Sequence, residues 1–210
     1  MKSYTINPKT RIGENSRIGD YAIIGEPPRG RKPGELETII GKNARIRSHS
    51  VIYAGTRIGD DFETGHGVLI REGNIIGSKV LVGSHTILED SSYLGNAVKI
   101  QSHAFIPRFT TIEDGVWIGP NVVITNDPHP PCGKCIKGPT LKRNAKIGAS
   151  ATILPFLTVG ENSLVGAGAV VVDDVPPNTV VIGCPARVIK GVKDLKCRFG
   201  IVDRPYLEDC

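Results

Sequence analysis

The sequence has few aromatic residues and no long apolar run. Aromatic residues make up 5% of the 210 residues, with a single Trp and a single Met. A core without rings must be built from small and branched aliphatic side chains, which suits thin, repeated layers better than a bulky sandwich. No apolar run approaches 18 residues, which excludes a transmembrane helix, and the first residues lack the apolar stretch of a signal peptide. We therefore expect a cytoplasmic protein without membrane insertion.

Blocks of like charge and a paired set of cysteines are also missing. The formal net charge is +5, but acidic residues are interspersed among the basic ones and no aromatic-plus-basic stacking motif is present. This composition argues against nucleic-acid binding and is compatible with small anionic ligands. The five cysteines are an odd number, which argues against a disulfide framework. Apolar residues at 40% and charged residues at 22% are typical of a folded chain.

A six-residue repeat runs through the chain. Of fifteen positions spaced by six, fourteen are Ile, Leu or Val, where chance would give about four. These positions are Ile40, Ile46, Ile52, Ile58, Thr64, Ile70, Ile76, Val82, Leu88, Leu94, Ile100, Ile106, Ile112, Ile118 and Ile124. The same register appears at Ile12, Ile18 and Ile24, and again from Ile147 to Val171. A period of six matches neither an α-helix nor a long alternating strand.

The repeat predicts short strands separated by corners. One aliphatic and one small residue in each hexad point inward, and glycine after the aliphatic eases the corner. Three hexads close an 18-residue coil, and successive coils stack as parallel strands about 4.8 Å apart. The sequence therefore predicts an all-β solenoid, a parallel β-helix.

Two breaks in the repeat mark insertions. The first, at 26–35, is basic and rich in turn residues, and the second is a longer loop at 125–146. Since insertions in a solenoid usually lie on a binding face, we expect function near these loops. The predicted organisation is one β-helix domain over 1–190, followed by a short tail or helix over 191–210.

Four segments of the second half carry a family resemblance. They are Ile124-Thr125-Asn126-Asp127-Pro128-His129-Pro130, the run from Gly138 to Ala149, the run from Val165 to Pro177, and Gly183-Cys184-Pro185-Ala186-Arg187-Val188-Ile189. In order and spacing they resemble the hexapeptide-repeat acyltransferases, nearest to the N-acetyltransferases of nucleotide-linked 3-amino sugars. The resemblance implies a left-handed β-helix, a homotrimer, acetyl-CoA as donor, and a nucleotide-sugar acceptor used in surface glycan or polysaccharide synthesis.

The start of the long loop supplies the candidate catalytic residues. Transfer of an acyl group to an amine needs a proton acceptor and a donor for the thioester oxyanion. His129 is the candidate base, because an unperturbed imidazole titrates near pH 6.5. Asp127 would orient that imidazole or hold the amino sugar, and Asn126 would hydrogen-bond the amine or the carbonyl. The alternative is that Asn-Asp-Pro is simply a turn and His129 a solvated residue.

Residues 18 apart should stack in columns. One column contains Glu72, Asp90, Arg108 and Asn126, and leads up to the loop. Arg108 suits a phosphate and the carboxylates suit sugar hydroxyls or the amine, although a solvated charge ladder is an equal alternative. A second column contains His49, His85 and His103. In a family trimer it would face a neighbouring subunit, and His103 is the candidate substrate contact, with interface packing as the alternative.

The resemblance also implies a coenzyme A groove along the last coils. The pantetheine amides would meet backbone groups of the protein, which small residues leave accessible, and basic residues would meet the phosphates. The candidates are Ala149, Ala167, Ala169, Lys142, Lys146, Arg187 and Lys190. Tight packing and surface solubility would explain the same residues without a ligand.

Metal binding and rival functions remain open in the sequence. Cys132 and Cys135 form half of a structural zinc site, which His129 or Cys197 would complete. The zinc hydratases of the same fold are disfavoured, because no His-x4-His pair is present. The predicted activity is N-acetyl transfer to a nucleotide-linked amino sugar. The alternatives are O-acetyl transfer to a sugar or serine hydroxyl, for which His129 would be indispensable, and a non-enzymatic scaffold subunit.

Overall fold

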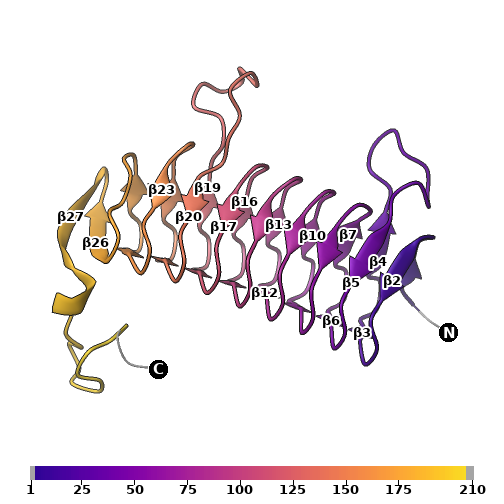
Figure 1. The fold of residues 1–210 in the computed structure, drawn as a ribbon, viewed down its shortest axis with the longest axis horizontal. Helices are drawn as coiled ribbons and strands as arrows, with labels where there is room; N and C mark the ends of the chain where they lie inside the picture. The colour runs from indigo at the N-terminus through magenta and orange to yellow at the C-terminus, as the bar shows by residue number, and fades with distance from the viewer. Residues whose placement is uncertain (1–2, 207–210) are drawn as a thin grey trace.

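Three parallel sheets enclose the core of the protein. The computed structural model describes residues 3–206, and the chain passes from each sheet to the next through a short corner (Figure 1). We name the sheets A, B and C in the order in which the chain enters them. Successive circuits of the three sheets stack along one axis, so that every third strand up to β25 belongs to the same sheet.

The strands are short, most of them two residues long. Sheet A consists of β1 (Thr5–Ile6), β4 (Ile23–Glu26), β7 (Val51–Tyr53), β10 (Leu69–Ile70), β13 (Ile87–Leu88), β16 (Phe105–Ile106), β19 (Val123–Ile124), β22 (Thr152–Ile153) and β25 (Val170–Val171). Sheet B consists of β2 (Thr10–Ile12), β5 (Thr38–Ile40), β8 (Arg57–Ile58), β11 (Ile75–Ile76), β14 (Tyr93–Leu94), β17 (Thr111–Ile112), β20 (Thr140–Leu141) and β23 (Thr158–Val159). Sheet C consists of β3 (Arg17–Ile18), β6 (Arg45–Ile46), β9 (Glu63–Thr64), β12 (Leu81–Val82), β15 (Lys99–Ile100), β18 (Trp117–Ile118), β21 (Lys146–Ile147), β24 (Leu164–Val165), β26 (Thr179–Gly183) and β27 (Ala186–Gly191).

The register of the strands confirms the predicted 18-residue coil. In sheet A, Leu69 pairs with Ile87, and Ile87 pairs with Phe105 in the next coil. The inward aliphatic of each hexad is buried, as Ile70, Leu88 and Ile106 show at 0% exposure. Each coil thus adds one layer of aliphatic side chains to a continuous core, and burial of these layers stabilises the stack.

Both insertions leave the solenoid at the same corner. The first connects β4 of sheet A to β5 of sheet B, and the second connects β19 to β20, again from sheet A to sheet B. Figure 1 shows the two loops projecting from the same side of the molecule. We call this corner, between sheets A and B, the A–B edge. Four coils separate the loops, and the candidate charged column runs between them.

The predicted end of the second insertion was wrong. Residues 140–146 do not belong to the loop, because Thr140 and Leu141 form β20 and pair with Thr111 and Ile112 of β17. Leu141 is fully buried and already carries the six-residue phase that continues at Ile147. The inserted loop therefore ends before Thr140.

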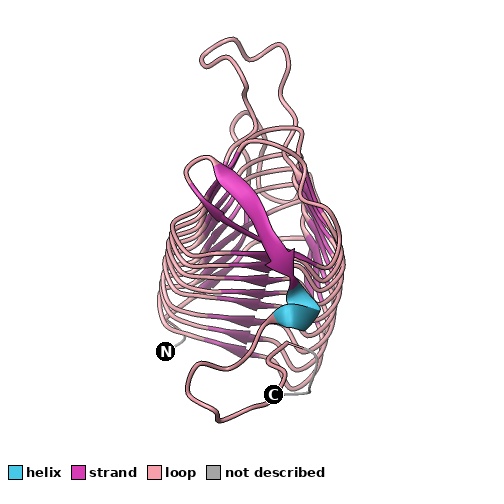
Figure 2. Cartoon of the chain, turned by 90° about the vertical axis from the view of Figure 1, so that its left-hand side faces the viewer, coloured by secondary structure: helices cyan, strands magenta, loops and turns pink. Residues whose placement is uncertain are grey.

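The C-terminal end of the solenoid changes strand direction. β27 pairs antiparallel with β26, and this hairpin lies across the end of the coil stack in Figure 2, which looks along the axis. A 3-10 helix, η1 (Val192–Asp194), follows β27 and leads into irregular chain up to residue 206. The predicted short helix or tail is thus present from Val192 to residue 206; the last four residues of the prediction lie outside the described residues.

Within residues 3–206, no helix has the length and apolar character that crossing a membrane requires.

Candidate functional site

The A–B edge brings together the charged column predicted from the sequence. The backbone N–H of Ser91 donates to the carbonyl of Glu72, one coil below it. The guanidinium of Arg108 lies 3.2 Å from the carboxylate of Asp90, and Nδ2 of Asn126 donates to the carbonyl of Arg108 at 3.3 Å. The column therefore stacks as predicted and ends at the root of the long loop.

Buried polar side chains hold this corner from inside. Asn74 donates through Nδ2 to the carbonyls of Arg71 and Glu89, and its Oδ1 accepts from the N–H of Ser92. In the next coils, the hydroxyls of Ser92 and Thr110 both donate to the carbonyl of Pro107. These bonds satisfy backbone groups that the corners leave unpaired inside the solenoid, and fix the backbone that carries the charged column.

Charges of both signs line the A–B edge. Arg71 donates to both carboxylate oxygens of Glu72, and this bond raises the pKa of Arg71. Asp90 is largely buried, with 15% of its side chain exposed, whereas 41% of the Arg108 side chain is exposed. The Nε of Arg108 is buried and has no hydrogen-bond partner among the described residues. A ligand cannot reach this buried Nε, but the exposed part of the Arg108 side chain leaves its guanidinium accessible to an anionic group.

The root of the long loop is closed by backbone hydrogen bonds. Lys137 donates its N–H to the carbonyl of Asn126 at 2.9 Å. The carboxylate of Asp127 accepts from the N–H groups of His129 and Gly133, at 2.9 and 3.2 Å. Asp127 is therefore committed to the turn of the loop and is not bonded to the imidazole of His129. That imidazole is exposed and makes no hydrogen bond to other described residues.

The histidine column lies at a different corner, between sheets C and A. The rings of His85 and His103 are stacked with their centroids 5.3 Å apart, and His49 contacts Tyr21 at 5.1 Å. Gly67 leaves room for the ring of His85, because a Cβ there would lie 2.7 Å from its Nδ1. The width of sheet A separates this column from the A–B edge. Within one chain, His103 is thus not part of the loop site.

The small residues predicted to bind the coenzyme are divided between surface and core. Ala149 and Ala167 lie at the C–A corner in consecutive coils. Ala149 is half-buried and Ala167 is exposed. Ala169 is fully buried in the core, its N–H donates to Gly166, and its carbonyl accepts from Thr152. Its side chain cannot line a surface groove and its N–H is already bonded, so Ala169 has no free backbone donor for the coenzyme.

The basic residues predicted to meet phosphates lie on several faces. Lys142 is paired with Glu113 at 2.8 Å, and this bond holds the pKa of Glu113 below its usual range. Lys146 lies on sheet C, against the ring of Tyr206, and burial lowers its pKa. Arg187 lies 3.3 Å from Asp173, and Lys190 is exposed on β27. The structure does not bring these four residues together.

The predicted zinc site is not supported. Cys132 and Cys135 are free and exposed, and residues 3–206 contain no group of three or more His, Cys, Asp or Glu side chains placed to hold a metal. The physical reason is the position of the loop, which projects away from the coils (Figure 1), so that no other element supplies further donors. Cys197 belongs to the C-terminal tail at the end of the solenoid.

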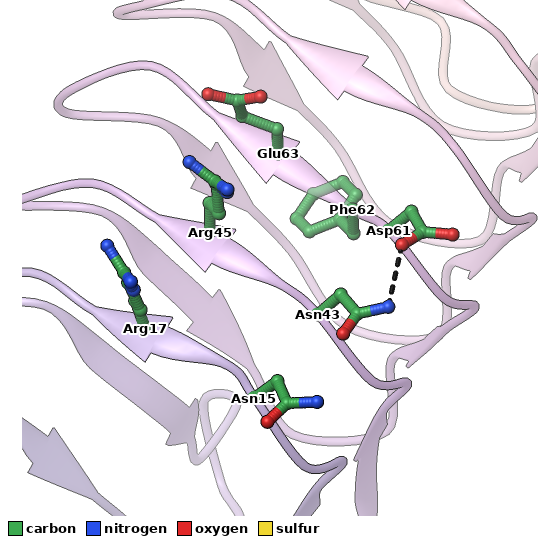
Figure 3. A pocket seen from close by; sticks show the side chains of 7 residues that line it. All are labelled: Asn15, Arg17, Asn43, Arg45, Asp61, Phe62 and Glu63. Atoms are coloured by element: carbon green, nitrogen blue, oxygen red, sulfur yellow. Dashed lines mark hydrogen bonds between the residues drawn. The ribbon is translucent and has the colours of Figure 1, made fainter.

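A hollow of about 670 Å³ lies away from the loop, at the N-terminal end of the B–C corner (Figure 3). Arg17, Arg45 and Glu63 project side by side from neighbouring strands of sheet C. Asn43 donates to Asp61 along the corner at 2.9 Å. The hollow holds charges of both signs and none of the residues that the sequence pointed to, so we do not place the reaction there.

Two aromatic residues at the loop root escaped the sequence analysis. Phe109 and Phe156 are 42% and 48% exposed at the A–B edge. Neither residue is an inward hexad position, and their spacing of 47 is not a multiple of 18. The insertion between them hides the column, which becomes visible only when the true length of the loop is known.

Comparison with known proteins gives partial matches to several acetyltransferases. Residues 143–173 match the family described as the hexapeptide repeat of succinyl-transferase. The chain is 41% identical over 91 residues to galactoside O-acetyltransferase of Escherichia coli, and the aligned segment covers 40% of this chain and 45% of that protein. It is 50% identical over 54 residues to 2,3,4,5-tetrahydropyridine-2,6-dicarboxylate N-acetyltransferase of Enterococcus faecalis, covering 26% and 23%. The chain spans less than half the length of these curated relatives.

A solved structure confirms the fold over most of the chain. The UDP-N-acetylglucosamine acyltransferase from Campylobacter jejuni superposes with a TM-score of 0.66, covering 90% of this chain and 73% of that one. The sequences are 16% identical, so the likeness concerns the fold. The predicted left-handed parallel β-helix is confirmed.

Proposed function

Since the chain belongs to the hexapeptide-repeat acyltransferase family, we propose that it transfers acetyl from acetyl-CoA to the amino group of a nucleotide-linked amino sugar. The observation that carries the proposal is the charged column of the A–B edge, which ends at the loop holding Asn126 and His129. Arg108, whose side chain is 41% exposed, would bind the acceptor phosphate, and Asp90 and Glu72 would bind sugar hydroxyls or the amine.

The proposed reaction forms a C–N bond and breaks a C–S bond. The neutral amine attacks the thioester carbonyl, the nitrogen loses a proton, and coenzyme A leaves as the thiol. His129 would accept the proton, since its exposed imidazole has no other described partner. Asn126 donates through Nδ2 to Arg108, which leaves its Oδ1 to accept a hydrogen bond from the amine. Asp127 would act on the loop backbone instead of the imidazole.

A homotrimer would complete this site. The loop and the C–A corner that carries Ala149, Ala167 and His103 lie at opposite edges of sheet A. The outer face of sheet A is apolar along successive coils, with Ile87 and Val123 37% and 40% exposed. Burial of this face against a second copy would remove apolar surface from water and bring the C–A corner of one subunit to the loop of the next.

O-acetyl transfer is the second candidate. It is favoured by the match to galactoside O-acetyltransferase, 41% identical over 91 residues. A hydroxyl is a far weaker base than an amine and needs a general base to attack a thioester. The two candidates therefore differ in how strongly they depend on His129.

The proposal is tested by thiol release from acetyl-CoA with a panel of UDP- and dTDP-linked 3-amino and 4-amino sugars. We expect turnover with at least one acceptor of the panel. Release with galactosides or serine, but with none of the amino sugars, would support the second candidate. Absence of both release and acetyl-CoA binding would contradict both candidates and favour a scaffold.

His129→Ala tests the proposed base. We expect turnover to fall about a hundredfold or more, within the range of general acid–base catalysis, with little change in the KM for acetyl-CoA. Lys134→Ala, at another exposed position of the same loop, is the matched control and should keep wild-type turnover. Equal activity of the two variants would remove His129 from the mechanism.

A further inference from the structure

Two exposed phenylalanines occupy corner positions that disfavour large side chains. Phe109 and Phe156 have φ angles of +62° and +66°, in the left-handed region. A bulky residue is strained there, whereas Asn tolerates the conformation. Asn occupies several other corners of this chain, among them Asn43, Asn121 and Asn144 at φ between +56° and +60°, although Tyr21 and His49 also adopt this conformation. Since both rings are also about half exposed, folding does not account for their presence.

The two phenylalanines lie directly below and above the coil that carries the loop. Thr111 pairs with Thr140, and Thr140 pairs with Thr158, so the residues two positions earlier form the column Phe109, Gly138 and Phe156. Two strand steps separate the phenylalanine Cα atoms by roughly 10 Å. Gly138 adds no side chain at this level, where the register of sheet A places Asp127, whose carboxylate accepts from backbone N–H groups of the loop. The two exposed rings therefore flank the root of the loop, one in the coil below it and one in the coil above it.

Each ring is accompanied by a cation. The guanidinium carbon of Arg108 lies 4.5 Å from the centroid of Phe109, and Nζ of Lys137 lies 6.0 Å from the centroid of Phe156. Arg108 is partly exposed beside Asp90, and Lys137 closes the root of the loop. Two aromatic faces beside two cations match a ligand that joins a flat heterocycle to phosphates.

We propose that Phe109 and Phe156 form a stacking site for the base of a nucleoside diphosphate, with Arg108 and Lys137 neutralising its phosphates. The inference rests on the proposed function, because it identifies this nucleotide as the one that carries the acceptor sugar. It assigns a binding role to residues that neither the hexad repeat nor the charged column explains, and it places the base at the loop root, beside Asn126.

Phe109→Asn and Phe156→Asn separate binding from folding. Asn relieves the strain of a left-handed corner, so we expect the unfolding temperature of each variant to equal or exceed that of wild type. The Kd for UDP and for dTDP, measured by calorimetry without donor, should rise about tenfold in each variant, as expected for loss of one stacking partner. The Kd for acetyl-CoA should not change. Phe109→Tyr keeps the ring and should keep the nucleotide affinity.

Tyr21→Asn is the matched control. Tyr21 is an exposed aromatic with φ of +59° at the C–A corner, far from the loop. Its replacement should affect stability as the phenylalanine variants do and leave every Kd unchanged.

The inference and the proposed function fail in different ways. Unchanged nucleotide affinity in both phenylalanine variants would overturn the inference even if acetyl transfer to an amino sugar were found. A loss of acetyl-CoA affinity in place of nucleotide affinity would also overturn it, because the rings would then hold the adenine of the donor. A tenfold loss of nucleotide affinity would support it even if no acetyl transfer were detected, and only the proposed function would fall.

Discussion

At the scale of single residues, Asn74 shows how a polar side chain supports this fold from inside. It is fully buried at a position where most other hexads have small residues, and it makes three hydrogen bonds to backbone groups of two coils. Asn74 departs from the small residues expected at this position of the repeat, but spacing could not show that its amide would hydrogen-bond two backbone carbonyls and one N–H group. That match depends on the geometry of the A–B corner, which the repeat does not specify.

Asn74→Ala should lower the free energy of unfolding by about 2–4 kcal/mol, because it leaves buried carbonyls and an N–H without partners. Asn96→Ala is the control, since Asn96 is exposed and water can replace its bonds. We expect chemical denaturation to show a loss below about 1 kcal/mol for the control. Equal losses in the two variants would contradict the stabilising role given to the buried amide of Asn74.

At the scale of elements, the long loop interrupts a stack that continues on both sides of it. Sheet B remains in register across the insertion, because β20 pairs with β17. The ion pair between Glu113, after β17, and Lys142, after β20, joins the same two coils. Sequence reasoning located the loop but extended it through residue 146, because Pro139 and the charged residues after Leu141 obscured a strand only two residues long.

Glu113→Gln should remove the pH-dependent contribution of the Glu113–Lys142 ion pair to the free energy of unfolding. The folded state lowers the pKa of Glu113, mainly through the hydrogen bond from Lys142, so the carboxylate stabilises the fold above the usual glutamate pKa. That contribution is lost as pH falls through the lowered value. Wild type should therefore be more stable than the variant at pH 7, by less than about 1 kcal/mol because both side chains are partly exposed.

The check is chemical denaturation of both proteins between pH 7 and pH 3. The difference in unfolding free energy should shrink steadily toward acid pH. A difference that stays constant, or grows on acidification, would contradict the assigned ion pair.

At the scale of the whole molecule, the architecture could be predicted from the sequence. The separation of the candidate site residues onto two opposite edges of sheet A could not. A period of six with inward aliphatics is sufficient to predict three-sided coils of 18 residues, since few other structures satisfy it. Handedness came from the family resemblance. The repeat alone could not show that Asn126 and Ala149 lie at opposite edges of sheet A. Nor does a period show which corner of one subunit meets which corner of its neighbour in an assembly.

Ile87→Glu tests the assembly that the divided site requires. Ile87 lies in the middle of sheet A with its side chain partly exposed, so a charge there should be harmless to a monomer and disruptive to a buried interface. Light scattering after size exclusion should give a mass about three times 22.5 kDa for wild type and a lower mass for the variant. Ile75→Glu, on the outer face of sheet B, is the control and should keep the wild-type mass. A monomeric wild type would contradict the trimer.

The proposed acetyl transfer at the A–B edge, from acetyl-CoA to an amine of a nucleotide-linked sugar, can be tested with two acceptors that differ only in an amino or a hydroxyl group at the same ring carbon. The measurement is kcat/KM for each acceptor. We expect the amino sugar to be the better substrate by about a hundredfold or more, with acetyl found on nitrogen in the product. Equal or faster acetylation of the hydroxyl compound would contradict it.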